Sequence, residues 1–466
     1  MGRPARMRRT RVPLDPGPAS RTALLGLLCL VVAACDLAAG SAAGSPSAPP
    51  GVVSPPPTAV VATTPTPTAE ASLLPPAVPS SVPPDPTIAP SPSIAGTAAG
   101  PVLDQDRPFD AATSRALQKV LDQARKRIPT PGISVAIRTA DGRVWLGTSG
   151  VRQLSPRRPV TDETVFSIAS ITKTFVSALV LQLVDEGKLS LDDRLAEFMP
   201  DFPNARRITI RQLLQHRSGV HNYFENPRYA RQAFRDPNRE WSAPEILRFV
   251  GAPYCQPGTC FHYSNTNFVL LGEVVEAVTG RRVSEEIRDR LLDPLGLEHT
   301  SYQPDERTPA NGAHGHLWGG GTTFFDQTEG DRWLPHMSAA SIAGASGAMV
   351  SNADDLARWA MALYGSDEVL PKELRDAMTD YRPRDRYGLG TRMRIFSGRR
   401  GFGHGGSLRG YEDQVWYFPR EGVSIALLSN RGLYNPDKTV RQLLRELWKH
   451  IDVPRPQYDP SRNTTG

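Results

Sequence analysis

Ser170 and Lys173, in the stretch SIASITKT at 167–174, have residue types and a spacing that suit catalysis. The chain holds 54 lysines and arginines, of which only seven are lysines, and none of the other six has a serine three residues before it. Lysine can lose its proton when it is buried, whereas arginine effectively cannot. Two interpretations follow. Lys173 is a solvated charge on a helix surface, or it shares the hydroxyl proton of a nucleophilic Ser170.

A helix that begins near Ser170 and continues through FVSALVLQLVDEG is expected to position this pair. Residues three apart lie on the same face of a helix, so the two side chains can meet. The positive end of the helix favours a developing alkoxide on Ser170. The apolar helix would desolvate Lys173 and lower its pKa, which suits a proton acceptor.

A second pattern, Tyr263-Ser264-Asn265, is the only Tyr-x-Asn in the chain. It precedes an apolar segment at 268–278 that predicts a helix. Tyr263 can serve as a proton carrier, and Asn265 can bind a substrate carbonyl through its amide. The alternative is a loop tyrosine followed by an asparagine that caps the helix.

A third pattern, GHGGSLRGYE, contains His404, Gly406 and Ser407 between strand-like segments. Glycines there allow a ligand backbone to approach closely. The backbone amide of Ser407, together with that of Ser170, can form an oxyanion hole. A histidine is partly charged near neutral pH, so any charge that His404 supplies is expected to depend on pH. Arg409 is an alternative source of positive charge. The alternative interpretation of the whole pattern is a glycine-rich hairpin without a catalytic function.

These three patterns, in this order and spacing, resemble the class C β-lactamase and D-alanyl-D-alanine carboxypeptidase group of the serine β-lactamase-like family, which includes penicillin-binding proteins. The sequence departs from the related class A signature, whose second and third motifs are Ser-Asp-Asn and Lys-Thr-Gly. Further stretches similar to the family's structural segments are ITIRQLLQHRSGV at 208–220, PLGLEHTSY at 294–302 and AGASGAMVSNADDLARWA at 343–360.

The resemblance implies a hydrolase that works through a covalent acyl-serine intermediate, with Ser170, Lys173 and Tyr263 as the catalytic residues. Its substrates would be acyl-D-amino-acid peptides of the cell-wall type, as for a carboxypeptidase. A second hypothesis is that the same site hydrolyses esters or β-lactams. A third hypothesis is a tethered protein that binds penicillins or cell-wall fragments without turnover. No metal or organic cofactor is required. His404 stands where β-lactamases of this family usually have a lysine that holds the substrate carboxylate. The resemblance therefore implies that His404 holds a carboxylate more weakly and in a pH-dependent way, and that β-lactam hydrolysis is poor.

The folded part is expected to span 106–456, with an α+β fold. Its length predicts two lobes, because it exceeds the size at which one core usually keeps growing. Strand-like segments near both ends, including a pair joined at Asp141-Gly142, predict one antiparallel sheet flanked by terminal helices at 112–127 and 438–451. A mainly helical lobe, at about 167–360, is inserted between them. The family resemblance implies the same arrangement, with the site in the cleft between sheet and lobe.

The N-terminal region predicts export. Residues 1–34 combine six arginines with the apolar run ALLGLLCLVVAA, which is typical of a signal peptide. VAAC at 32–35 resembles the lipobox of bacterial lipoproteins, so Cys35 is the expected lipid attachment site and the membrane the expected location; an ordinary secretory signal is the alternative. Residues 35–105 hold seventeen of the 44 prolines, which predicts a disordered tether, and 457–466 predicts a flexible tail.

Charge and cysteine content agree with an exported enzyme. Residues 1–34 contain six arginines and one aspartate, so without them the chain has 48 basic and 47 acidic residues and its net charge falls from +6 to +1. Nucleic-acid binding therefore gains no support.

Cys255 and Cys260, in CQPGTC, are expected to form a disulfide in an oxidising compartment. A zinc site is the alternative, with His262 as its only nearby additional ligand.

Overall fold

The computed structural model describes residues 106–233, 235–307, 310–328 and 333–454. Its largest element is an eight-stranded sheet in the order β1-β3-β2-β13-β12-β11-β10, with β4 paired to β3. From β3 to β10 in this order, each pair of adjacent strands is antiparallel. Strand β1, at the other edge, runs parallel to β3. The strands are β1 (Arg107–Pro108), β2 (Gly132–Thr139), β3 (Arg143–Gln153), β4 (Arg158–Pro159), β10 (Arg392–Phe396), β11 (Arg399–Leu408), β12 (Tyr411–Phe418) and β13 (Val423–Ser429).

The sheet joins segments from both ends of the described chain, which confirms the predicted α+β class. Strand β2 pairs with β13, so Val135 lies opposite Leu427 although the two residues are far apart in sequence. The predicted turn at Asp141-Gly142 connects β2 to β3, and Gly142 has a φ of 85°, which a side chain would disfavour.

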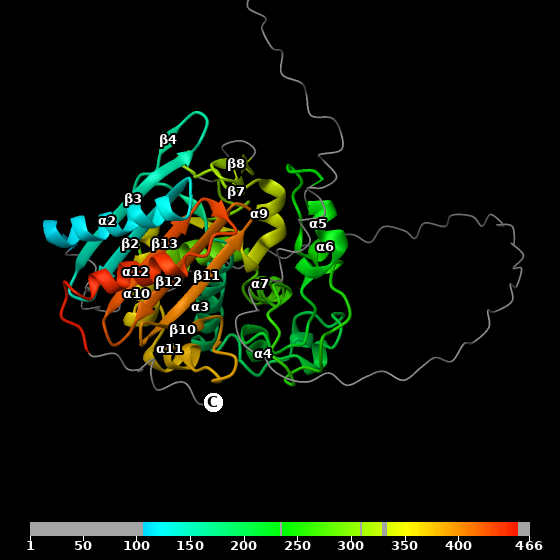
Figure 1. The fold of residues 1–466 in the computed structure, drawn as a ribbon. Helices are drawn as coiled ribbons and strands as arrows, with labels where there is room; N and C mark the ends of the chain where they lie inside the picture. The colour runs from blue at the N-terminus through cyan, green and yellow to red at the C-terminus, as the bar shows by residue number, and fades with distance from the viewer. Residues whose placement is uncertain (1–105, 234, 308–309, 329–332, 455–466) are drawn as a thin grey trace, which may run out of the picture. The chain divides into compact units, whose positions relative to one another are not determined.

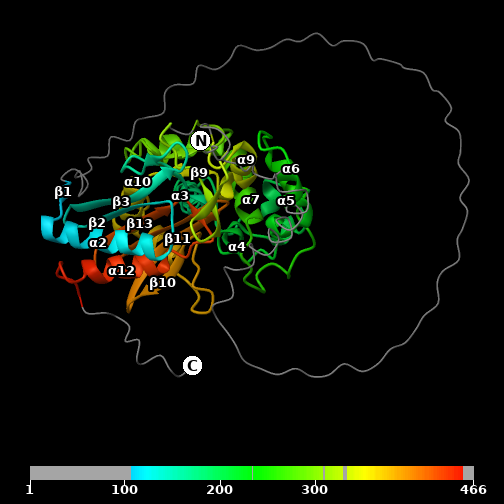
Figure 2. The same ribbon diagram turned by 45° about the horizontal axis from the view of Figure 1, so that its top comes forward.

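Helices α2 (Ala111–Arg127) and α12 (Asp437–Leu447) cover one face of the sheet (Figures 1 and 2). Both helices were predicted, and their apolar residues pack against the strands. The core on this face is formed mainly by Leu117, Leu121, Ile133, Val135, Ile137, Trp416, Phe418, Val423, Ile425, Leu427, Val440, Leu443, Leu444 and Leu447. Residues that alternate with them along β2 and β13, such as Ala136 and Ala426, belong to the core on the other face, because successive strand side chains point to opposite sides.

The second face of the sheet packs on α10 (Ala353–Gly365), which contacts β2, β12 and β13. The sequence analysis extended the helical lobe to about residue 360, but α10 belongs to the sheet layer. Its buried residues include Leu356, Trp359 and Leu363, and the ring of Trp359 stacks on Phe175 at a centroid distance of 4.0 Å. This stacking links the sheet layer to the helix that follows Ser170.

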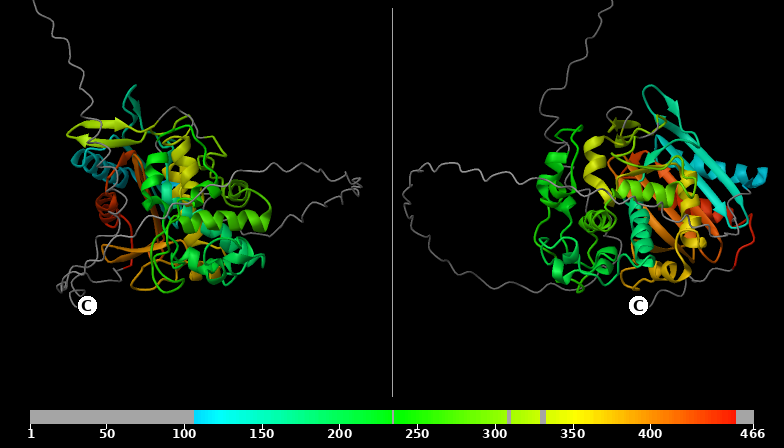
Figure 3. Two further views of the ribbon diagram at one scale, coloured as in Figure 1. Left: turned by 90° about the vertical axis from the view of Figure 1, so that its right-hand side faces the viewer. Right: turned by 180° about the vertical axis from the view of Figure 1, so that it is seen from behind.

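The inserted lobe is mainly helical, and its helices α4 to α7 lie to one side of the strands, as the green segments of Figure 3 show. Its elements are η1 (Ala169–Ile171), α3 (Thr172–Asp185), η2 (Leu195–Glu197), η3 (Ala205–Arg207), α4 (Ile210–Leu214), η4 (Tyr223–Glu225), α5 (Pro227–Ala233), α6 (Ala243–Leu247), α7 (Thr266–Thr279), α8 (Val283–Ile287), η5 (Arg288–Leu292), α9 (Met337–Ala343) and η6 (Gly344–Ser346). Helices α3 and α7 contact each other and form the inner part of the lobe.

Short strands and one further helix complete the described chain. One small sheet has the order β5-β9-β6 and another has the order β14-β7-β8. The elements are β5 (Phe166–Ser167), β6 (Ser301–Tyr302), β7 (His316–Gly320), β8 (Thr323–Asp326), β9 (Met349–Ser351), β14 (Arg431–Gly432) and α11 (Lys372–Thr379). Strands β5 and β9 position η1, since the N–H of Ile168 bonds to the carbonyl of Met349 at 3.0 Å.

Cys255 and Cys260 form a disulfide, as predicted. The loop that it closes is joined to the segment after α4 by backbone hydrogen bonds, among them Tyr254 N–H to Gly219 O at 2.9 Å and Gly258 N–H to Arg217 O at 2.7 Å. The chain is therefore held in place just before Tyr263.

The predicted signal peptide, Cys35, the tether and the C-terminal tail lie outside the described residues. Within the described part of the chain, no helix combines the length and apolar character needed to cross a membrane.

Candidate active site

Ser170 lies in η1, directly before α3, and its side chain is partly accessible. The preceding residue, Ala169, has a φ of 45°, a conformation that costs a non-glycine residue energy and is enriched at functional sites. Strand β11 passes close to this turn: a Cβ on Gly406 would lie 2.2 Å from the carbonyl oxygen of Ile168. Only glycine therefore fits at position 406. Because Gly406 packs against the backbone of Ile168, the edge of β11 lies next to Ser170.

Lys173 is completely buried, which excludes the solvated-charge interpretation. Its Nζ lies 3.0 Å from Ser170 Oγ, 2.8 Å from Asn265 Oδ1 and 2.6 Å from the backbone carbonyl of Ser346. Burial, reinforced by the nearby charge of Arg392, holds the pKa of Lys173 well below its usual value.

The hydrogen-bond partners of Lys173 suit a neutral amine. Two of them, the Asn265 amide oxygen and the Ser346 carbonyl, can only accept protons. A neutral amine satisfies both with its two N–H bonds, and its lone pair then faces the hydroxyl of Ser170. The arrangement therefore suits transfer of the Ser170 proton to Lys173.

Tyr263 is the second proton-transfer group beside the nucleophile. Its hydroxyl donates a hydrogen bond to Ser170 Oγ at 3.0 Å. With the lysine on one side and the tyrosine on the other, Ser170 Oγ has one partner that can take its proton and one that can stabilise the resulting alkoxide. The sequence analysis predicted this group of three residues, and the structure brings them together.

Asn265 contacts Lys173 rather than an open position for a substrate carbonyl. Its Oδ1 accepts from Lys173 Nζ, and its Nδ2 lies 3.4 Å from Asn222 Oδ1. The same Asn222 oxygen accepts from the backbone N–H of Asn265 at 3.2 Å. Asn222 thereby orients the amide so that oxygen, not nitrogen, faces the lysine; the sequence analysis did not identify Asn222.

His404 differs from the expected partly charged group. Its side chain is buried, and its two ring nitrogens contact Tyr387 Oη at 3.1 Å and the Gly405 carbonyl at 2.6 Å. Burial, reinforced by the nearby charge of Arg392, keeps the pKa of His404 well below its usual value. Burial therefore argues against the expected titration of His404 between about pH 6 and 8, because it disfavours the charged imidazole.

His216, at the end of α4, completes a chain of buried groups with Tyr387 and His404. His216 Nδ1 accepts from the N–H of Ser264 at 3.2 Å and from Asn267 Nδ2 at 3.1 Å. Nε2 must therefore carry the proton, and it donates to Tyr387 Oη at 3.2 Å. The tyrosine hydroxyl is then the donor to His404 Nε2. This chain connects the loop that carries Tyr263 to strand β11.

Arg392, the first residue of β10, supplies the positive charge that the sequence analysis sought in His404 or Arg409. Its guanidinium lies 5.0 Å from the ring centre of Tyr263 and 5.4 Å from that of Tyr387. Among the described residues, no carboxylate forms an ion pair with it. Arg409, in contrast, donates to the side chain of Gln327. Arg392 is one of many arginines and no local pattern distinguishes it, so sequence reasoning had no signal that could identify it.

Ser407 contributes to the site through its backbone only. Gly406 faces Ile168 and Ala169, so the next side chain along the strand points to the opposite side of the sheet, where Ser407 Oγ donates to Glu412 at 2.8 Å. In the described sheet, β10 pairs with β11 only as far as Gly403. The edge of β11 from His404 to Leu408 is therefore open beside η1, which suits an extended peptide and an amide-lined oxyanion hole.

The arrangement is that of an acyl-transfer site, and no step of that chemistry needs a metal. Within the described residues, no group of three or more metal-binding side chains is clustered. His314, two residues before His316 in the sequence, bonds to Asp326 at 2.8 Å.

Residues 117–447 match the β-lactamase family, so the chain belongs to that family. Penicillin-binding protein 4 of Amycolatopsis lactamdurans is 31% identical over 370 residues, covering 73% of this chain and 91% of the relative. A D-aminopeptidase of Brucella anthropi is 29% identical over 336 residues, covering 69% of this chain but only 60% of the relative.

Among solved structures, the D-amino acid amidase of Ochrobactrum anthropi SV3, complexed with L-phenylalanine amide, superposes with a TM-score of 0.64 at 25% identity. The match covers 73% of this chain and 99% of the amidase. The fold and the family together define the protein as a serine hydrolase related to β-lactamases and penicillin-binding proteins.

Replacing the two central residues tests the acyl-transfer arrangement. Ser170→Ala should abolish hydrolysis and labelling by a fluorescent penicillin, while the unfolding free energy changes by less than about 1 kcal/mol. Lys173→Arg should lower kcat by about a thousandfold, because a guanidinium cannot accept the serine proton. The matched control is Lys188→Arg, whose side chain is 53% exposed and pairs with Glu186. Near-normal turnover by Lys173→Arg would exclude the lysine from proton transfer.

Tyr387→Phe tests the buried chain. The change leaves His216 Nε2–H and His404 Nε2 without a partner, and we expect a loss of about 2 kcal/mol in unfolding free energy together with a several-fold lower kcat. Urea unfolding and steady-state kinetics measure the two effects. Tyr417→Phe is the control, since Tyr417 is also buried and its hydroxyl has no hydrogen-bond partner among the described residues. Equal stability of both variants would contradict a structural role for the Tyr387 hydroxyl.

Proposed function

We propose that the protein is a D,D-peptidase of the carboxypeptidase type, which removes a C-terminal D-residue from cell-wall-type peptides through an acyl-serine intermediate. Ser170 is the nucleophile, Lys173 the base that accepts its proton, and Tyr263 the proton carrier. Asn265 keeps the lysine in place, and the open edge of β11 holds the peptide backbone.

The proposed reaction has two stages. As Ser170 Oγ bonds to the carbonyl carbon, its proton passes to Lys173, and the carbonyl oxygen takes up negative charge facing the N–H groups of Ser170 and Ser407. The C–N bond then breaks, the leaving amine takes a proton from Tyr263, and the proton on Lys173 neutralises the tyrosinate. Water hydrolyses the ester: its oxygen bonds to the acyl carbon, and one of its protons passes through Tyr263 back to Ser170.

The observation that carries this proposal is the guanidinium of Arg392, which lies beside Tyr263 and forms no ion pair with any described residue. A carboxypeptidase substrate presents a terminal carboxylate close to the scissile bond, and arginine binds carboxylates through paired, charge-assisted hydrogen bonds. His404 and His216 are both neutral, so Arg392 is the fixed charge that a substrate meets at this place.

A D-aminopeptidase or D-amino acid amidase is the second candidate, because relatives with these names share the family. Such a substrate carries an ammonium next to the scissile carbonyl, and Arg392 would repel it. Turnover of esters, or slow turnover of β-lactams, is compatible with the same acyl-serine chemistry.

Three matched substrates distinguish the candidates: an N-acyl-D-Ala-D-Ala with a free carboxylate, the same peptide with a C-terminal amide, and D-alanine anilide with a free ammonium. We expect kcat/KM to be highest for the free acid and at least about tenfold lower for the amide-capped peptide. Preferred cleavage of the anilide would replace this proposal with an aminopeptidase.

Arg392→Gln should raise KM for the free-acid peptide at least about tenfold and leave the amide-capped peptide unaffected. Arg394→Gln, on the same strand, is the control, since Arg394 pairs with Asp437 of α12. In the wild-type enzyme, KM for the free acid should stay flat from about pH 6 to about pH 8, because arginine keeps its charge and His404 stays neutral. A KM that rises steadily over that range would assign the carboxylate to a histidine.

We also propose that residues 1–34 direct export and that Cys35 carries a lipid, so that the catalytic domain works outside the cytoplasm on a long tether. The support is the lipobox-like VAAC followed by a proline-rich segment. Cell-wall peptides lie in the same compartment, and the Cys255–Cys260 disulfide suits it.

Metabolic labelling with radioactive palmitate tests the anchor. The wild-type protein should be labelled and sediment with membranes, whereas Cys35→Ser should lose the label and appear in the soluble fraction. Cys29→Ser is the control, because that residue would leave with the signal peptide. Label or membrane attachment that persists in Cys35→Ser would rule out this anchor.

A further inference from the structure

A groove of about 730 Å³ lies in the helical lobe and includes none of the catalytic residues in its lining. Its walls come from the segment after η2, the loop at 218–221, α6 and α7. Phe198, Phe202, Leu247 and Val250 are half-buried apolar residues of these walls, packed on the main core by part of their surface only. A cavity of this size with mainly apolar walls and a few polar groups is typical of a small-molecule site.

The charged groups of the groove are of one sign. Asp201, Glu273 and Glu276 line it, and no lysine or arginine does, although the chain has 54 of them. Glu273 and Glu276 lie three residues apart on α7 and therefore share one face of the helix.

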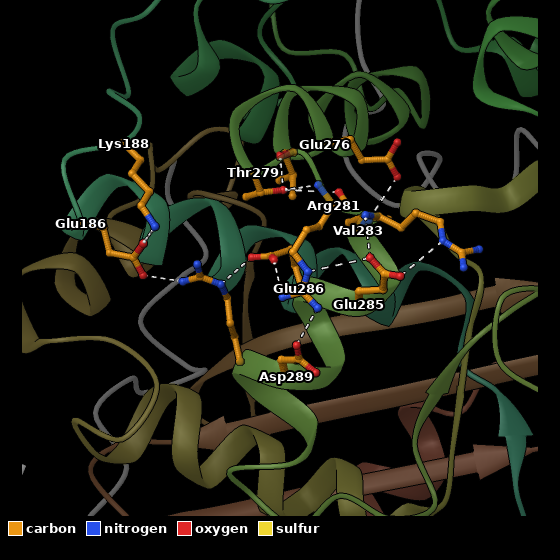
Figure 4. Close-up of polar contacts among 12 residues, drawn as sticks. Glu186, Lys188, Glu276, Thr279, Arg281, Val283, Glu285, Glu286 and Asp289 are labelled. Atoms are coloured by element: carbon orange, nitrogen blue, oxygen red, sulfur yellow. Dashed lines mark hydrogen bonds and ion pairs between the residues drawn. The ribbon is translucent and has the colours of Figure 1, made fainter. Parts of the chain in front are cut away.

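The two glutamates lack a neutralising partner. Glu276 accepts a hydrogen bond from the backbone N–H of Val283 at 3.1 Å, and no described residue bonds to the carboxylate of Glu273. The neighbouring Arg281 directs its guanidinium to Glu286 and Asp289 instead (Figure 4). Burial, reinforced by the charge of Glu276, raises the pKa of Glu273 above its ordinary value. His221, the other titratable residue of the lining, accepts at Nδ1 from the N–H of Gly251 at 3.2 Å.

We propose that this groove is a second binding site, specific for an organic ammonium carried on an apolar body, such as a primary alkyl or arylalkyl amine. The apolar walls bind the body, and Glu273 and Glu276 bind the ammonium. An ammonium offers three donors to two carboxylates that repel each other, so it relieves the repulsion and restores hydrogen bonds to half-buried oxygens. A neutral ligand of the same shape would leave the two charges uncompensated, and an anion would add a third.

The test uses the full chain carrying Cys35→Ser, so that no lipid or detergent competes for the probe. The probes are 4-phenylbutylamine, 4-phenylbutan-1-ol and 4-phenylbutanoate, which share one body and differ in charge. Calorimetry or ligand-observed NMR should give a Kd for the amine at least about tenfold below that of the alcohol, and no binding of the carboxylate.

Three variants place the probe in the groove. Glu273→Gln should raise the Kd of the amine about tenfold without lowering the melting temperature, since it removes a repulsion. Ala277→Phe, at an exposed lining position of α7, should fill the groove and abolish binding. Glu285→Gln on α8, outside the groove, should bind the amine like the wild type.

The proposal is overturned if the alcohol binds as tightly as the amine, or if the amine fails to bind at concentrations up to about 10 mM. It is also overturned if Glu273→Gln or Ala277→Phe leaves the Kd of the amine unchanged. Because Ser170 and its partners are absent from the lining, the result does not depend on which substrate the catalytic site accepts.

Discussion

The buried amine of Lys173 is the constraint on which the rest of the catalytic site depends. An ordinary lysine in the unfolded chain is protonated, so a lowered pKa in the folded state costs stability, and the cost grows as the pH falls below about 10.5. The fold limits this cost by giving the nitrogen acceptors from two other elements, Asn265 before α7 and Ser346 in η6. The result is a base held 3.0 Å from the nucleophile.

Neutral histidines and one arginine set the electrostatic character of the site. An exposed imidazole carries partial charge near neutral pH, but His216 and His404 are buried and bonded to each other through Tyr387. Arg392 is then the permanent charge on the substrate side. In the function proposed above, Lys173 and Tyr263 transfer protons, whereas Arg392 recognises the substrate carboxylate.

Helix α7 connects two regions of opposite electrostatic character. Its N-terminal end follows Asn265, beside a lysine and an arginine, whereas Glu273 and Glu276 lie two to three turns further along, in a groove without basic residues. The groove wall is bonded to the first turn of α7, since Ser218 Oγ donates to Asn267 Oδ1 at 2.6 Å and Thr266 Oγ1 donates to the carbonyl of His221 at 2.6 Å. The same helix thus supports the catalytic lysine at one end and forms the acidic wall at the other.

The sequence alone determined the features that depend on local pattern: the helices at both ends, the paired strands and the cysteine pair. Periodicity and short-range contacts decide these features. The set of Ser170, Lys173 and Tyr263 was also predicted from the sequence, through three motifs whose order and spacing resemble a known family. Only the tertiary structure decided the neutral state of His404, the orientation of Asn265 toward Lys173, and the role open to Arg392. A pKa or a side-chain direction depends on burial and on partners from distant segments, which spacing along the chain does not encode.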